Sequence, residues 1–137
     1  VLAQEELSHF KMVHEIIKER GLKLGRERKD SYVNELFKYK MKGGNRQQSL
    51  IDRLLISAMI EARSCERFKT LSENINDEKL AKFYHDLMVC EAGHYTLFLG
   101  YARKYGEGID VDKQWKSLIE FEGEIIKKYG KQETIHG

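Results

Sequence analysis

The sequence predicts an all-α protein whose long helices pack together as a bundle. Proline, the residue that most strongly interrupts helices, is absent from the 137 residues. Apolar residues recur at intervals of three and four in several segments, and no segment alternates as a half-buried strand does. The length suits one domain with its own core, so we expect a single domain over residues 1–137.

The first predicted helix covers residues 1 to about 20, and Gly21 ends it. Its apolar positions are Leu2, Val13, Ile16 and Ile17. The segment is already in helical periodicity at its first residue, without a methionine or an N-cap residue. We therefore expect that an N-terminal piece with a further helix is absent from this sequence.

A basic connection leads to a short predicted helix over residues 30–41, with Asp30 or Ser31 as its N-cap, and then to the loop KGGNRQQ. From Lys18 to Arg46 there are ten lysines and arginines against four acidic residues. Such an excess of positive charge attracts phosphate, although a solvated helix surface can carry the same charge.

Three long helices complete the prediction, over about residues 49–71, 77–104 and 111–129, and Gly106 and Gly108 separate the last two. Their apolar stripes are Leu50, Leu54, Leu55, Ala58, Ala62, Cys65 and Phe68; then Leu80, Phe83, Tyr84, Leu87, Leu97, Phe98 and Tyr101; then Trp115, Leu118, Ile119, Phe121, Ile125 and Ile126.

No run of about 18 apolar residues and no signal peptide occurs, and the two cysteines form no CxxC pair. These features predict a cytoplasmic protein without a membrane span.

Acidic and imidazole side chains interrupt three of the predicted apolar stripes. They are Glu6 and His9 in the first helix, Glu61 in the helix over residues 49–71, and Glu91 and His94 in the next helix. Steps of three and four residues keep a side chain on one helix face, so all five should point into the bundle. Several carboxylates buried together repel one another and lose hydration, which costs several kcal/mol per ion unless cations compensate them. Two bound metal ions would supply that compensation.

The Glu-x-x-His spacing occurs twice, which is more specific than a single copy. Ferritin-like di-iron and di-manganese bundles use one Glu-x-x-His unit from each of two helices and one Glu from each of the other two. Here Glu61 is one lone glutamate, and the missing helix would carry the other. Glu5 is an imperfect substitute, because its Cβ is turned about 100° from that of Glu6. The pattern predicts a ferritin-like four-helix bundle with additional short helices, without its first bundle helix, that binds iron or manganese.

Three stretches resemble a known family. They are EELSHF from Glu5, DRLLISAMIEARSCERF from Asp52 and KFYHDLMVCEAGHY from Lys82. These words closely resemble the MiaE-type tRNA-(2-methylthio-N6-isopentenyladenosine) hydroxylases, over residues 1–103 and more loosely over the last helix. The resemblance implies a ferritin-like di-iron monooxygenase of the bacterial cytoplasm, which uses O2 and two electrons to hydroxylate the isopentenyl group of a hypermodified adenosine next to the anticodon. It also implies that Glu6, His9, Glu61, Glu91 and His94 bind two iron ions, while the family's first-helix glutamate has no counterpart here.

The implied partners are tRNA and an electron-donating reductase, and the oligomeric state stays open, with a monomer as one option. The candidate RNA-binding residues are Lys23, Arg26, Arg28, Lys29, Lys40, Lys42 and Arg46, with Arg63 and Arg67 as a second possibility. Ala58, Phe68 and Leu87 either shape a pocket for the isopentenyl group or pack the core.

Two other functions remain open from the residues alone. Another ferritin-like di-metal oxidoreductase, of the ferroxidase, peroxidase or catalase type, would use the same ligands. A non-catalytic RNA-binding helical module would instead pair the inward acids with Arg63 or Arg67 and carry no iron.

Overall fold

The computed structural model describes residues 2–26, 29–40 and 44–129, and every regular element in these ranges is a helix. In chain order the elements are α1 (Leu2–Glu19), α2 (Ser31–Leu36), α3 (Arg46–Asn74), α4 (Glu78–Tyr105) and α5 (Val111–Tyr129). The predicted all-α class is therefore confirmed.

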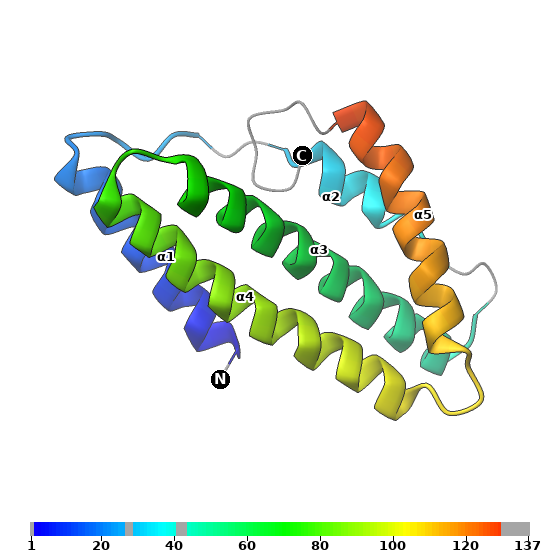
Figure 1. Ribbon diagram of the computed structural model, residues 1–137. Helices are drawn as coiled ribbons and strands as arrows, with labels where there is room; N and C mark the ends of the chain where they lie inside the picture. The colour runs from blue at the N-terminus through cyan, green and yellow to red at the C-terminus, as the bar shows by residue number, and fades with distance from the viewer. Residues whose placement is uncertain (1, 27–28, 41–43, 130–137) are drawn as a thin grey trace.

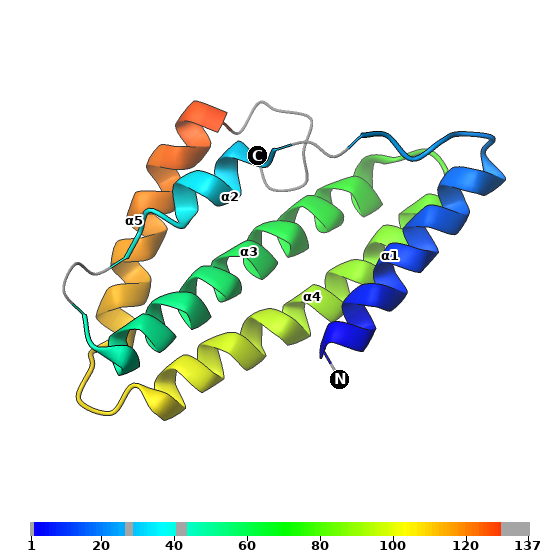
Figure 2. The ribbon, with the colours of Figure 1, turned by 180° about the vertical axis from the view of Figure 1, so that it is seen from behind.

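The two longest helices, α3 and α4, form an antiparallel hairpin that runs the length of the molecule (Figure 1). From both sides α1 lies along the first part of α4 (Figure 2). Two ion pairs hold its last turn there, between Arg20 and Asp77 and between Lys79 and Glu19. On the other side of α3, α2 and α5 pack against each other.

Short polar side chains set the start of three helices. Asp30, Asn45 and Asp77 each accept a hydrogen bond from the backbone N–H three residues later, at 2.9–3.0 Å. Asp30 was one of the two predicted caps for α2. Asn45 lies in the predicted loop, and because it acts as a cap, α3 begins at Arg46, three residues before the expected start.

The second helix is shorter than predicted. It ends at Leu36 with Phe37 as its C-cap, and a tighter turn follows in which the Tyr39 N–H bonds the Leu36 carbonyl. The Tyr39 hydroxyl donates to the Gln114 carbonyl of α5 at 3.1 Å, so this segment turns toward α5 instead of continuing the helix. Met41, the expected end, lies outside the described residues.

The core lies between α2, α3, α4 and α5, and none of the described residues of α1 is buried. Its largest fully buried side chains are Tyr32, Leu36, Ile51, Leu55, Ile56 and Leu118. Five residues of the predicted stripes are 39–47% exposed, so their assignment to the core was wrong: Val13, Leu50, Leu97, Tyr101 and Ile119. In α3, Ile51 faces the core together with Leu55 and Ala58, and Leu50 is turned about 100° away from it.

Gly106 ends α4 at a close approach of the backbone to itself. A Cβ atom at this position would lie 2.7 Å from the Ala102 carbonyl oxygen, so a larger residue would force the chain apart. In the part of the chain that the structure describes, no helix combines the length and apolar character needed to cross a bilayer.

Candidate metal centre

Glu91 and His94 lie three residues apart on the inner face of α4, and each is only 5% exposed. Leu87, one turn before Glu91, is also buried. The helix continues past these polar groups without interruption, so packing of the surrounding apolar turns holds both side chains inside.

Carboxylates from two other helices meet this pair. One donor atom from each of Glu6, Glu61, Glu91 and His94 lies within 4.8 Å of the others, which is a spacing that a metal site can use. Glu6 comes from α1, Glu61 from α3, and the remaining two residues from α4. Four of the five predicted ligands are thus brought together from segments far apart in sequence.

The imidazole of His94 is the central group of this cluster. Its Nδ1 lies 3.1 Å from Glu6 Oε1 and 3.1 Å from Glu91 Oε2. Its Nε2 lies 3.3 Å from Glu5 Oε2 and 3.8 Å from Cys90 Sγ. Metal-binding histidines commonly donate their second ring N–H to a carboxylate, and Glu5 is placed for that role.

The fifth predicted ligand, His9, lies beside the cluster. Its Nδ1 is 3.6 Å from Glu91 Oε1 and 3.8 Å from Glu6 Oε2, too far for a hydrogen bond. This buried atom makes no hydrogen bond to any residue in the described ranges. A buried nitrogen without a partner is costly, and a cation bound between these carboxylates would satisfy it.

The electrostatics of the cluster favour a cation. Burial, followed by the hydrogen bond and negative charge of Glu91 and the charge of Glu6, raises the pKa of Glu61 from 4.5 to about 8. Burial and the charge of Glu91 also raise the pKa of the Cys65 and Cys90 thiols, which makes both poor thiolate ligands. Carboxylates and imidazoles without thiolate form the donor set expected of iron or manganese. The residues present fit such a metal ion.

The two sides of the centre differ in exposure. Glu91 and His94 are buried, whereas the side chains of Glu5 and Glu6 are 46% and 50% exposed. The centre is therefore closed on the α4 side and more open along α1 in the residues that the structure describes.

Arg63 does not neutralise these acids. Its guanidinium pairs with Glu122 of α5 and with Glu66, and its Nε donates to Glu122 Oε1 at 3.0 Å. Tyr32 of α2 donates to the same carboxylate oxygen at 3.1 Å. This finding argues against the module in which the inward acids pair with Arg63. Sequence reasoning missed the buried Glu122, which lies in an apolar stripe between Leu118 and Ile125.

The predicted RNA-binding residues do not form one surface. Lys23 and Arg26 are exposed in the connection after α1, Lys40 is exposed after α2, and Arg46 is the first residue of α3. Lys29 is exposed just before the cap of α2, while Arg28 and Lys42 lie outside the described residues.

The predicted residues lie toward opposite ends of α4. Arg20, three residues before Lys23, pairs with Asp77 before the first turn of α4, whereas Arg46 lines a pocket with Tyr105 at the last turn of α4. The 28 residues of α4 separate these two ends by about 40 Å.

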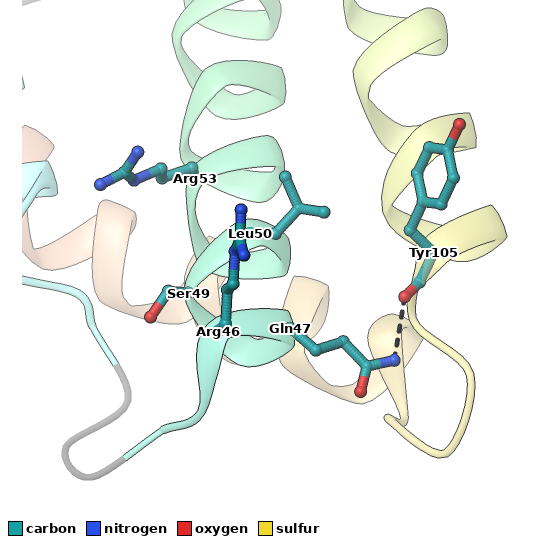
Figure 3. A pocket seen from close by; sticks show the side chains of 6 residues that line it. All are labelled: Arg46, Gln47, Ser49, Leu50, Arg53 and Tyr105. Carbon is teal, nitrogen blue, oxygen red and sulfur yellow. Dashed lines mark hydrogen bonds between the residues drawn. The ribbon is translucent and has the colours of Figure 1, made fainter.

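A pocket with a volume of about 660 Å³ lies at the Arg46 end (Figure 3). Arg46, Arg53 and Leu50 line it from α3 and Tyr105 from α4, and Gln47 donates to the Tyr105 carbonyl at 3.0 Å. Arg53 was not among the predicted contacts, because it stands outside the basic segment of the sequence. None of the predicted metal ligands lines this pocket.

Comparisons with known proteins point in one direction. The family model described as tRNA-(MS[2]IO[6]A)-hydroxylase (MiaE) matches residues 1–137. A tRNA 2-(methylsulfanyl)-N(6)-isopentenyladenosine(37) hydroxylase of Pseudomonas putida (strain KT2440) is 35% identical over 135 residues, covering 98% of this chain and 64% of the relative. A hydroxylase of the same name from Salmonella typhimurium (strain LT2) is 32% identical over 136 residues, covering 99% of this chain and 49% of the relative. The chain thus spans about half to two thirds of the length of these relatives.

A solved structure is also similar. It is described as protein 43 with aldehyde deformylating oxygenase activity from Synechococcus, and it matches with a TM-score of 0.84 and 31% sequence identity. The match covers 98% of this chain and 65% of that chain. Together with the all-helical fold, this likeness confirms the predicted ferritin-like architecture.

Proposed function

The chain belongs to the MiaE family of tRNA hydroxylases, and from this premise we propose that it provides the di-iron centre of an O2-dependent tRNA monooxygenase. The substrate would be the isopentenyl group of a hypermodified adenosine next to the anticodon. The observation that carries the proposal is the convergence of Glu6, Glu61, Glu91 and His94 from three helices, with the unpartnered Nδ1 of His9 beside them.

The reaction replaces one C–H bond of the isopentenyl group by a C–OH bond. One oxygen atom of O2 enters the product, and the other leaves as water with two protons and two electrons. Two iron ions, when bound, would supply the O2 reduction and the oxidation of that C–H bond. The electrons would come from a reductase, and the setting would be the cytoplasm.

The side chains of the centre have separate tasks in this proposal. Glu6 and His9 from α1 and Glu91 and His94 from α4 would hold the ions, with Glu61 completing the ligand set. Glu61 would give up its proton when a cation binds, because its raised pKa keeps it neutral without one. The buried Leu87 keeps water from the α4 side of the centre.

A second candidate follows from the solved structure of the Synechococcus protein. Because that protein is described as having aldehyde deformylating oxygenase activity, a similar di-metal centre could act on an aldehyde instead of a tRNA side chain. The two functions are separated by offering both substrates to the same iron-loaded, intact protein. Hydroxylation of the tRNA nucleoside without aldehyde turnover supports the proposal, and aldehyde turnover alone supports the second candidate.

The decisive test is nucleoside mass spectrometry of tRNA from cells with and without the gene. We expect the hydroxylated isopentenyl adenosine to disappear without the gene and to return with the wild-type gene, but not with the Glu91→Gln variant. Glu124→Gln, an exposed acid of α5 paired with Lys127, is the matched control and should restore the product. An unchanged level of the hydroxylated nucleoside in cells without the gene would contradict the proposal.

A further inference from the structure

A cavity of about 300 Å³ lies between α1, α3 and α4, and we propose that it holds the isopentenyl group of the substrate while the base and its phosphates stay outside. The inference rests on the proposed function, because it places the group that is to be hydroxylated. It also assigns a role to each of three apolar residues, Ala58, Phe68 and Leu87, which were expected either to shape a pocket for the isopentenyl group or to pack the core. Phe68 and Leu87 line the cavity, whereas Ala58 is fully buried in the core.

The walls of the cavity are mostly apolar. Val13 and Ile16 contribute from α1, Phe68 from α3, and Phe83 and Leu87 from α4. The rings of Phe68 and Tyr84 stack at one wall, with centroids 6.0 Å apart and planes inclined by 19°. An isopentenyl group contains only carbon and hydrogen, so its burial against this lining is favourable. Burial of a base or a phosphate there would be unfavourable, because their polar groups would lose hydration.

The cavity begins next to the metal centre. Val13 follows His9 by four residues and Leu87 precedes Glu91 by four, which is about 6 Å of helix in each case. Because α1 runs antiparallel to α4, both steps lead to the same side of the centre. An isopentenyl group that packs against Val13 and Leu87 would therefore have its end next to His9 and Glu91.

Exposed cations and acids mark the opposite end. Arg20 lines the cavity there, and Lys79, Glu15 and Glu19 line an adjoining groove with Phe83. Both cations are exposed and belong to the ion pairs that join α1 to α4. An isopentenyl chain that enters from this end points inward, and the phosphates of its nucleotide remain near Arg20 and Lys79.

Size and position favour this cavity over the larger pocket of Figure 3. A volume of about 300 Å³ is at the lower limit for ligand pockets, which suits a five-carbon chain better than a whole modified nucleotide. Arg53, the residue of the larger pocket that is nearest Glu61 in sequence, is eight residues from it, about 12 Å along α3. That pocket is too distant to bring a C–H bond to the centre.

The test fills the cavity without changing the ligands. Val13→Phe places a larger side chain at the inner end, at a position 39% exposed and therefore tolerant of size. Val89→Phe makes the same change on α4 at a position 56% exposed and outside the cavity, and it is the matched control. The probe is an anticodon stem-loop RNA, prepared with the isopentenyl adenosine or with plain adenosine. Affinities are measured with the intact iron-loaded protein, whose iron content and circular dichroism report folding.

We expect the wild type and Val89→Phe to bind the isopentenyl RNA at least about 10-fold more tightly than the plain RNA, since burying each CH2 group contributes appreciably to affinity. Val13→Phe should reduce this preference to within about 2-fold while its affinity for plain RNA stays the same.

Equal preference in all three proteins, or none in the wild type, would overturn the inference even if the tRNA is hydroxylated. A Val13-dependent affinity for a long-chain aldehyde but not for the isopentenyl RNA would overturn the proposed occupant. Loss of the preference in Val13→Phe without hydroxylation by the wild type would support the binding cavity and contradict the proposed function.

Discussion

Glu5 and Glu6 are neighbours in sequence, yet they contact opposite nitrogens of the same histidine. Glu6 lies near His94 Nδ1, on the side of Glu91, and Glu5 lies near Nε2. The turn of about 100° between consecutive residues of a helix separates the two carboxylates. The sequence suggested Glu5 as an imperfect replacement for a missing ligand, and its position beside Nε2 suits the orientation of His94 instead.

This arrangement predicts unequal effects of two conservative substitutions. Glu6→Gln removes a carboxylate from the cluster and should weaken binding of Fe(II) or Co(II) by more than about 100-fold, while Glu5→Gln should weaken it by about 10–100-fold. Calorimetric titration of the metal-free protein measures both. Glu15→Gln, an exposed acid on the same helix, serves as the control. Equal losses in Glu5→Gln and Glu6→Gln would show that the two carboxylates share one role.

Glu61 makes the stability of the metal-free protein depend on pH. Its pKa is 4.5 ordinarily and about 8 in the folded chain, so between these values the folded state binds more protons than the unfolded state. The free energy of unfolding should therefore fall as pH rises from about 5 to about 8. Urea unfolding in the presence of a chelator measures this slope, and Glu61→Gln should flatten it. If the free energy of unfolding of Glu61→Gln falls with pH as steeply as that of the wild type, other groups cause the pH dependence.

At the scale of the elements, α1 is attached differently from the other helices. It contributes no fully buried residue, and its polar contacts to α4 in the described ranges are the cluster of Glu5, Glu6 and His9 with Glu91 and His94 near its start and the two ion pairs near its end. The hairpin of α3 and α4, by contrast, shares a packed core with α2 and α5.

Removal of metal should therefore loosen α1 before it loosens the hairpin. Without a cation the carboxylates of Glu6 and Glu91 repel each other, and little apolar burial compensates for that repulsion. Hydrogen exchange followed by mass spectrometry should show faster exchange in α1 after chelation and unchanged exchange in the middle of α3. Unchanged protection of α1 would mean that its ion pairs and exposed contacts suffice to hold it.

The carboxylate of Glu122 joins three helices, since Tyr32 of α2 and Arg63 of α3 both donate to it from α5. Glu122→Gln removes the charge that balances the largely buried guanidinium of Arg63, which should lower the free energy of unfolding by roughly 3 kcal/mol. Glu124→Gln breaks only an exposed pair and should change it by less than about 1 kcal/mol. Urea unfolding measures the free energy of unfolding of both variants. Equally small losses in Glu122→Gln and Glu124→Gln would show that the pair of Arg63 and Glu122 contributes little to stability.

At the scale of the whole molecule, positive charge divides between its two ends. Lys23 and Arg26 follow Arg20 at the end where the proposed isopentenyl cavity opens, while Arg46 and Arg53 line the pocket at the other end, about 40 Å away along α4. A substrate that enters the cavity from the Arg20 end would place its phosphates near the first group.

We therefore expect Lys23→Ala with Arg26→Ala to weaken tRNA binding and to reduce the slope of log affinity against log salt by about 1–2. Arg46→Ala with Arg53→Ala removes the same charge from the opposite end and should have the smaller effect. Filter binding over a range of salt concentrations measures both slopes. A larger change in the second pair would place the RNA across the pocket of Figure 3.

Much of the fold and of the candidate site follows from local patterns. The spacing of apolar residues predicted the long helices, because a helix repeats every 3.6 residues wherever it packs. The Glu-x-x-His spacing placed Glu91 and His94 on one face for the same reason. The local pattern failed where packing decides which of two consecutive residues faces the core, as for Leu50 and Ile51. It also failed where a segment turns toward a distant helix, as the segment with Tyr39 does toward α5.

The sequence by itself determined that Glu91 and His94 share the inner face of one helix and that buried charges there need compensation, since helical periodicity and desolvation act within one segment. Only the tertiary structure decided that Glu6, Glu61 and Glu91 meet at His94, that Arg63 pairs with Glu122, and that an apolar cavity begins one turn from Glu91. These results depend on how the antiparallel helices are aligned along one another. The alignment is set by contacts between residues dozens of positions apart, which no local spacing encodes.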